Sequence, residues 1–295
     1  MKKPLFSTLV LSLLCISLSF AQKKGKTITL FDSELSNFEK WIGVPHETVE
    51  GLPAGTYQSA NVHAGTPLGL NNDIKNVFST IEENGEVVLK ITGEIYGGLT
   101  TKASYQNYHL SVYFKWGEKK WAPRLNILRD NGILYHAYGA HGRFWKTWKT
   151  SLEYQVQETD MGDFISIGGN TGQPKVGSPI IEIKGDNTDK RGKFNINSKT
   201  YLKKPGYVSA YPETDLPNGQ WNHLELYVVG NNSVHVVNGE IVMVVENAKK
   251  HDGTILNKGQ IQIQSEAAEC YYKQLTITGI NKFPKKIRKQ IQLKK

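Results

Sequence analysis

The chain has 295 residues, of which 39% are hydrophobic, 21% charged and 10% aromatic. This balance is typical of a globular protein and excludes a disordered, a collagenous and a polytopic membrane chain. The length allows one large domain or two ordinary ones. The two cysteines, Cys15 and Cys270, are too few for a disulfide framework.

The formal net charge of +9 arises at the two ends of the chain. Once Lys2, Lys3 and seven basic residues between Lys282 and Lys295 are set aside, 27 of the 36 basic residues remain against 27 acidic ones. A nucleic-acid-binding protein carries a basic face interleaved with aromatic residues, so no nucleic-acid partner is predicted. The basic tail, residues 282–295, is interpreted as a frayed, solvated extension. Weak adhesion to an anionic surface such as a membrane leaflet is the alternative.

Residues 1–21 have the pattern of a signal peptide for export. Two lysines precede an apolar run from Leu5 to Phe20, which ends in the small-residue pattern Ser19-Phe20-Ala21. The run of about 16 residues is shorter than the ~20 needed to span a bilayer. We therefore expect export without an integral membrane segment after cleavage. The mature chain then keeps one thiol, Cys270, which cannot form an internal disulfide.

Short strand-like runs broken by Gly, Asn and Pro turns dominate from Thr27 to Ile280. In chain order, the clearest runs are Val87–Thr92, His109–Trp116, Gly132–Tyr138, Leu152–Glu158, Trp221–Val229, Ser233–Val237, Glu240–Val245, Gly259–Ser265 and Tyr271–Thr278. They predict an all-β jelly-roll sandwich of two antiparallel sheets, in a single domain over residues 22–281. Residues 168–217, rich in Gly, Pro, Asn and Lys, are interpreted as a long excursion with about two short strands.

Two of these runs carry glutamine and glutamate at alternate positions, which places them on one face of a strand. The polar set on the two runs is Glu153, Gln155, Gln157, Gln260, Gln262, Gln264 and Glu266. Planar amides and carboxylates bind hydroxyl groups, and aromatic faces stack on sugar C–H surfaces. Aromatic residues near these runs in sequence are Trp121, Tyr138, Trp145 and Trp148. The pattern favours a saccharide-binding face, the alternative being an ordinary solvated face.

Acids, bases and aromatic residues are densest between Trp116 and Asp163. His136 lies within a predicted strand, where it is either an acid–base group or a structural residue. Asp160-Met161-Gly162-Asp163 makes a divalent cation such as calcium possible, but it lacks the alternating acidic loop of calcium sites, so no metal ligands and no cofactor are assigned. Signatures of serine hydrolases, dinucleotide or phosphate loops and zinc proteases are missing from the sequence.

Five segments, in this order, resemble the 3-keto-disaccharide hydrolase family over about residues 30–280. They are Lys115-Trp116-Gly117, Arg129-Asp130-Asn131-Gly132-Ile133-Leu134-Tyr135-His136, Ser151-Leu152-Glu153-Tyr154-Gln155-Val156-Gln157-Glu158, Gly219-Gln220-Trp221-Asn222-His223 and Gly259-Gln260-Ile261-Gln262-Ile263-Gln264-Ser265-Glu266. The resemblance implies a concanavalin-like jelly roll, export to the bacterial periplasm or cell surface, and action on glycosides oxidised at C3.

The resemblance also assigns individual residues. Glu153 and Gln155 fall on the family's Glu-x-Gln, Glu158 on its usual aspartate and Glu266 on its late glutamate. Many members carry Asn-Ser-Gly-Ile followed by an arginine, whereas this chain has Asp130-Asn131-Gly132-Ile133 and then His136. This departure leaves open a substrate other than 3-keto sugars.

A ketone at C3 acidifies the C2 proton, so that a base can form an enolate and the C1 substituent can leave before water adds back. We expect Glu153 and His136 as the catalytic base and acid, with Arg124 or a cation on the oxyanion. The expected substrate-binding residues are Arg124, Asp130, Asn131, Trp148, Gln155, Gln157, Glu158, Gln264 and Glu266. One alternative is an ordinary glycosidase using Glu153 with Glu158 or Glu266, although Glu158 has the opposite strand parity. Another is a non-catalytic carbohydrate-binding module.

Overall fold

The computed structural model describes residues 25–170, 176–187 and 191–293. The expected signal peptide, residues 1–21, lies outside these ranges. Within them the chain forms strands, which confirms the all-β prediction, and one short helix, α1 (Lys285–Gln290). The strands are β1 (Thr27–Thr29), β2 (Phe38–Ile42), β3 (Gly69–Leu70), β4 (Phe78–Glu83), β5 (Glu86–Ile91), β6 (Gly97–Thr101), β7 (Tyr108–Lys120), β8 (Gly132–Tyr138), β9 (Thr150–Gln157), β10 (Asp160–Ile167), β11 (Ile180–Asn187), β12 (Gly192–Phe194), β13 (Tyr201–Lys203), β14 (Tyr207–Ser209), β15 (Asn222–Val229), β16 (Asn232–Val237), β17 (Glu240–Lys249), β18 (Gln260–Ser265) and β19 (Ala268–Gly279).

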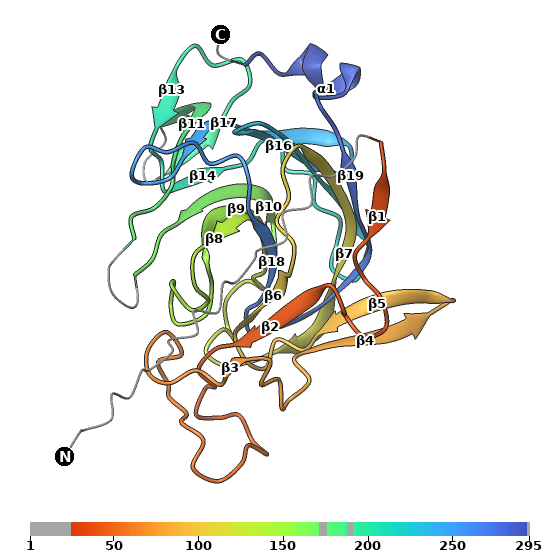
Figure 1. Cartoon of the computed structure of the whole chain (residues 1–295), viewed down its shortest axis with the longest axis vertical. Helices are drawn as coiled ribbons and strands as arrows, with labels where there is room; N and C mark the ends of the chain where they lie inside the picture. Colours follow the sequence, from red (N-terminus) through yellow and green to blue (C-terminus); the bar gives the residue numbers. More distant parts are fainter. Residues whose placement is uncertain (1–24, 171–175, 188–190, 294–295) are drawn as a thin grey trace, which may run out of the picture.

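The strands form a sandwich of two sheets (Figure 1). The back sheet has the order β4–β5–β19–β7–β15–β16–β17, with β1 also on β19. The front sheet has the order β3–β2–β6–β18–β8–β9–β10–β14–β12. Among the described strands, β12 and β14 pair in parallel and the other ladders are antiparallel. Strand β11 pairs with β12 and with β17, so hydrogen bonds join the two sheets along one side.

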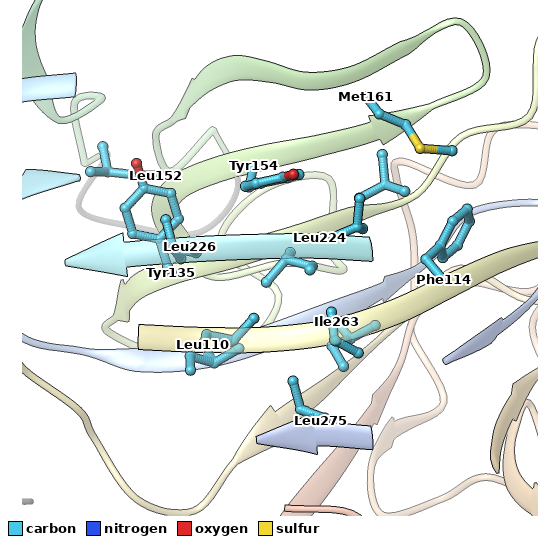
Figure 2. Packing of buried hydrophobic residues seen from close by; sticks show 14 of the residues in the cluster. Leu110, Phe114, Tyr135, Leu152, Tyr154, Met161, Leu224, Leu226, Ile263 and Leu275 are labelled. Carbon is cyan, nitrogen blue, oxygen red and sulfur yellow. The ribbon is translucent and has the colours of Figure 1, made fainter. Parts of the chain in front are cut away.

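The core lies between the sheets because alternate residues of each strand point inward. Strand β7 shows the pattern over its first nine residues, where buried and half-buried side chains alternate. Its Leu110 is paired with Leu226 of β15, and both contact the core beneath Tyr135 and Tyr154 of the front sheet (Figure 2). Each fully buried side chain of this size stabilises the fold by about 1.5–3 kcal/mol. The Tyr154 hydroxyl donates to Val236 O at 3.0 Å, so its polar tip is also satisfied.

The excursion over residues 168–217 is more regular than predicted. It carries four strands, β11 to β14, instead of two, and β11 is eight residues long. The many Gly and Asn residues suggested loops, but Gly185 lies within a strand. A Cβ there would overlap the Lys193 carbonyl, so the glycine allows the β12 backbone to approach β11 closely.

The prediction of a frayed, solvated C-terminal tail is wrong for its described part. Phe283, Ile287 and Ile291 are buried and belong to the hydrophobic core. Ile287 is the buried residue of α1, and Phe283 and Ile291 flank the helix four residues to either side. In the described ranges, no helix combines the length and the hydropathy needed to cross a membrane.

Candidate active site

The outer face of the front sheet brings together the two polar runs identified in the sequence. Strand β8 lies between β9 and β18, so Gly132 is a neighbour of both glutamine-rich strands. A Cβ at Gly132 would overlap Glu153 Oε1 and lie 2.7 Å from Gln264 Oε1. The missing side chain therefore makes room for Glu153 and Gln264 to meet above the sheet, where the Gln264 amide hydrogen-bonds the Glu153 carboxyl group.

An arginine from the loop between β7 and β8 completes this group. Arg124 Nη2 lies 2.7 Å from Asp130 Oδ2, and Arg124 Nη1 lies 3.1 Å from Glu266 Oε1. Gln155 also hydrogen-bonds Asp130. One guanidinium thus joins a carboxylate at the start of β8 to a carboxylate at the end of β18. We call Arg124, Asp130, Glu153, Gln155, Gln264 and Glu266 the acid cluster.

Burial raises the pKa of all three carboxyl groups, and the charge of Arg124 opposes the rise at Asp130 and Glu266. Burial raises the pKa of Asp130 to about 6, although the Arg124 charge opposes the rise. Burial and the Asp130 charge raise the pKa of Glu153 well above its ordinary range. The same two causes raise the pKa of Glu266, against Arg124. The cluster therefore combines Asp130, which is paired with Arg124 and has a pKa of about 6, with Glu153 and Glu266, whose charged forms burial disfavours.

Four side chains of the acid cluster have a buried polar atom without a hydrogen-bond partner in the described part of the chain. These atoms are Arg124 Nε, Asp130 Oδ1, Gln155 Oε1 and Gln264 Oε1. Buried polar atoms in folded proteins are nearly always paired, so one free donor beside three free acceptors indicates a place for a polar ligand or water. The cluster reaches the surface, since the side chains of Arg124, Asp130 and Glu266 are 17%, 10% and 6% exposed.

Aromatic residues from three loops flank the acid cluster. The Tyr96 hydroxyl hydrogen-bonds Arg124. Trp148 stacks on Tyr96 with ring centroids 5.8 Å apart, and the Trp145 and His63 rings lie 4.0 Å apart beside them. The Trp148 indole is 1% exposed and donates to Gly97 O at 3.0 Å. Trp148 therefore supports Tyr96 and does not offer a free face to a sugar, contrary to the expectation that it binds substrate.

His136 lies outside the acid cluster. It occupies a bulge in β8 with φ +51°, and its side chain is 1% exposed. Burial lowers the pKa of His136 to about 3, so the ring is neutral and a weak base at physiological pH. No hydrogen bond or ion pair joins it to Glu153 among the described residues. The pairing of His136 with Glu153 as acid and base is therefore not favoured.

Three other expected substrate-binding residues also point elsewhere. Asn131 is fully buried, donates to Gln264 O at 2.7 Å and accepts from the Tyr272 hydroxyl, so it fixes the strands. Gln157 Nε2 donates to Asp160 Oδ2 at 2.6 Å. Glu158 is paired with Arg129 at 3.0 Å and lies at the end of β9, away from the cluster. Strand parity explains the separation of Glu158 from Glu153.

The cation alternative does not fit Asp163. Its carboxylate oxygens accept hydrogen bonds from the Ala210 amide and the Tyr207 hydroxyl, and the residue is buried. Over the residues that the structure covers, no three His, Cys, Asp or Glu side chains meet in a metal-binding arrangement.

Residues 26–278 match the sequence model of the 3-keto-alpha-glucoside-1,2-lyase-like domain. The chain belongs to this family. The match agrees with the resemblance found in the sequence and indicates a carbohydrate-acting protein. None of the curated proteins compared matches the chain.

Several solved structures are similar to the chain at low identity. A candidate glycosyl hydrolase from Parabacteroides distasonis is 16% identical with a TM-score of 0.45, the alignment covering 86% of this chain and all of the other. Carbohydrate-binding module CBM66 from Bacillus subtilis is 9% identical with a TM-score of 0.40, covering 68% and 92%. Domain 4 of the arabinanase AbnA from Geobacillus stearothermophilus is 12% identical with a TM-score of 0.38, covering 92% and 100%.

Proposed function

We propose that this chain is an exported enzyme that cleaves glycosides oxidised at C3 by acid–base elimination in the acid cluster. The family membership supports action on such glycosides. The observation that carries the proposal is the different surroundings of two neighbouring carboxyl groups: Arg124 pairs with Asp130, which has a pKa of about 6, whereas burial and the Asp130 charge raise the pKa of Glu153. A base and an acid that coexist at neutral pH are what an elimination requires. Export rests on the signal pattern of residues 1–21.

The proposed roles differ from those expected from the sequence, because Asp130 is the base in place of Glu153 or His136. Its free Oδ1 takes the C2 proton, and the electron pair of the C2–H bond forms an enolate with the C3 carbonyl. The free Arg124 Nε–H donates to the developing oxyanion. The enolate then re-forms the ketone as the C1–O bond breaks, and Glu153 gives its proton to the leaving oxygen. Addition of water across the resulting C1–C2 double bond yields the 3-keto sugar.

The remaining members of the cluster position these groups. Glu266 and Asp130 hold Arg124 from two sides, and Gln264 orients the Glu153 carboxyl group. The free amide oxygens of Gln155 and Gln264 are acceptors for sugar hydroxyl groups. The same two carboxyl groups with different surroundings also suit an ordinary glycosidase, so the two reactions must be separated by experiment.

The test is to incubate the protein with a disaccharide and with its C3-oxidised form in D₂O, and to measure released sugar and deuterium at C2. Release from the oxidised form alone, with deuterium at C2, supports elimination. Release from the native disaccharide without C2 exchange refutes elimination and identifies a direct glycosidase. Binding of either sugar without any release refutes an enzymatic function and leaves a carbohydrate-binding module.

A further inference from the structure

The C-terminal helix α1 is held on the sandwich by apolar side chains within it and on either side of it. Phe283, Ile287 and Ile291 are 4%, 5% and 6% exposed and belong to the main hydrophobic core, and Leu293 packs against that core. Figure 1 shows α1 at the upper end of the molecule, above β19. The basic residues between these anchors therefore occupy fixed positions on the surface.

Five exposed cations lie among the anchors, whereas residues 281–293 contain no acidic residue. The cations are Lys282, Lys285, Lys286, Arg288 and Lys289. Within the described ranges, none of these five side chains is paired with a carboxylate or placed over an aromatic ring. Because the body of the chain is balanced in charge, this segment carries most of the net positive charge.

The helix turns all four of its cations away from the sandwich. At about 100° per residue, Lys285, Lys286, Arg288 and Lys289 spread over an arc of about 160°, and the centre of that arc is opposite the buried Ile287. No aromatic residue belongs to the helix. The outer side of α1 is therefore a broad cationic face, which we call the basic face.

The basic face is unfavourable for the helix that carries it. Lys285 and Lys286 lie in the first turn, where the helix dipole repels cations and where no acidic residue offsets them. Lys285 also precedes Arg288 and Lys289 by three and four residues, the spacings at which like charges repel each other. A structural role in the last turn accounts for Arg288 and Lys289 alone. A bound anionic surface would offset the repulsion among all four.

The kind of anion follows from the shape and composition of the basic face. A saccharide site is concave and combines apolar or aromatic side chains with a few polar groups, whereas α1 presents an outward array of cations. The headgroups of an anionic lipid leaflet form a broad negative surface that attracts each nearby Lys or Arg. The apolar anchors are already buried in the core, so they do not insert into the bilayer. Contact through charge alone is reversible and weakens with salt.

We propose that the basic face, with Lys282, docks the protein reversibly on a membrane leaflet rich in anionic phospholipids. The acid cluster contributes no residue to this contact, so the docking does not depend on the proposed reaction. The expected export of the chain brings it to the outer side of the membrane that it has crossed.

The test is vesicle flotation of residues 22–295, since the apolar run of the expected signal peptide would itself bind lipid. Vesicles of phosphatidylcholine, alone or with about one-third phosphatidylglycerol, are used at about 0.02 M and 0.5 M NaCl. We expect binding only to the phosphatidylglycerol vesicles and only at low salt. The triple variant Lys285→Gln, Lys286→Gln, Lys289→Gln should weaken that binding at least about 30-fold.

A second triple variant is the matched control. Lys75→Gln, Lys102→Gln, Lys119→Gln removes the same charge from exposed lysines of other parts of the chain and should keep the affinity within about 3-fold. Thermal unfolding verifies that both variants are folded, which is expected because the six side chains are exposed.

Three outcomes would overturn the proposal. One is equal binding by the native chain and the α1 variant, and another is equal binding to vesicles with and without phosphatidylglycerol. The third is the absence of flotation at low salt. If the native chain then binds polygalacturonate and the α1 variant does not, the partner of the basic face is an anionic polysaccharide and the membrane proposal is wrong.

Discussion

Replacing Asp130 with asparagine separates the charge of the proposed base from its shape. The amide oxygen can still accept from Arg124, and the side chain keeps its volume. The variant therefore resembles protonated Asp130 at every pH. We expect it to be inactive as a base and, at neutral pH, more stable than the native chain.

The size of the stability change follows from the pKa of Asp130. Burial raises it from an ordinary 3.8 to about 6, so ionising the folded protein costs about 3 kcal/mol more than ionising the unfolded chain. For a raised carboxyl pKa, the stabilising contribution is complete below pH 3.8 and is lost as the pH rises through 6. Asparagine never ionises, so its advantage grows from near zero at about pH 4 to about 3 kcal/mol above pH 7. For a chain of this size that is about 5–10 °C in Tm.

The assay is thermal unfolding of both proteins between pH 4 and pH 8, beside sugar release at pH 7. Other carboxyl groups titrate in both proteins, so the difference in Tm isolates Asp130. Release should fall about 10²- to 10⁴-fold, the usual contribution of a general base. A Tm difference that does not change with pH would contradict a buried carboxylate at this position. Sugar release by the variant at the native rate would show that Asp130 is not the catalytic base.

Four further predictions test other parts of the molecule. Glu153→Gln should not lower the Tm, since burial and the Asp130 charge disfavour the ionised form of Glu153, and should lower sugar release about 10²- to 10⁴-fold, whereas Glu240→Gln at an exposed position should leave release unchanged. Gly132→Ala should lower release at least about 10-fold with native-like circular dichroism, because its Cβ displaces the Glu153 carboxyl group; normal kinetics would contradict the proposed geometry. His136→Asn should keep the pH dependence of kcat, since asparagine also tolerates the positive φ at this position. Loss of one limb of that profile would show that His136 is a catalytic acid or base. Phe283→Ala should lower the free energy of unfolding by about 3–5 kcal/mol in urea titrations, since Phe283 is buried in the core, and no change would restore the solvated tail.

Much of the fold and part of the candidate site could be predicted from local sequence patterns. The side-chain period of two in a strand is a local property, so the alternation of Glu153 and Gln155 identified their shared face before any pairing was known. The Asn238-Gly239 dipeptide between β16 and β17, with φ of +50° and +90°, is likewise a local signal for their hairpin. Gln264 was predicted to lie on the same side as Glu266 by the same reasoning, and Arg124 and Glu266 meet as a salt bridge.

Local patterns could not predict the register between strands or the bulges that interrupt it. His136 lay within a predicted strand, but a bulge in β8 shifts the register between Tyr135 and Tyr138 and keeps it out of the cluster, and no local pattern in the sequence predicts that bulge. Tyr96 reaches Arg124 from a loop far away in the sequence, which only the tertiary fold determines. A glycine inside a strand, such as Gly132, often marks a position that other groups approach closely. The sequence did not show that the approaching side chains are Glu153 and Gln264.

The position of a single cation explains how one fold can hold a base and an acid side by side. Asp130, Glu153 and Glu266 are all buried, and burial alone would protonate all three. Arg124 touches Asp130 and Glu266 but not Glu153, and Asp130 also accepts from Gln155. Asp130 is therefore the carboxyl group with the most support for its charged form, while Glu153 is hydrogen-bonded by the Gln264 amide and has its pKa raised by burial and by the Asp130 charge. The division of roles follows from which side chains the loop between β7 and β8 brings to the start of β8.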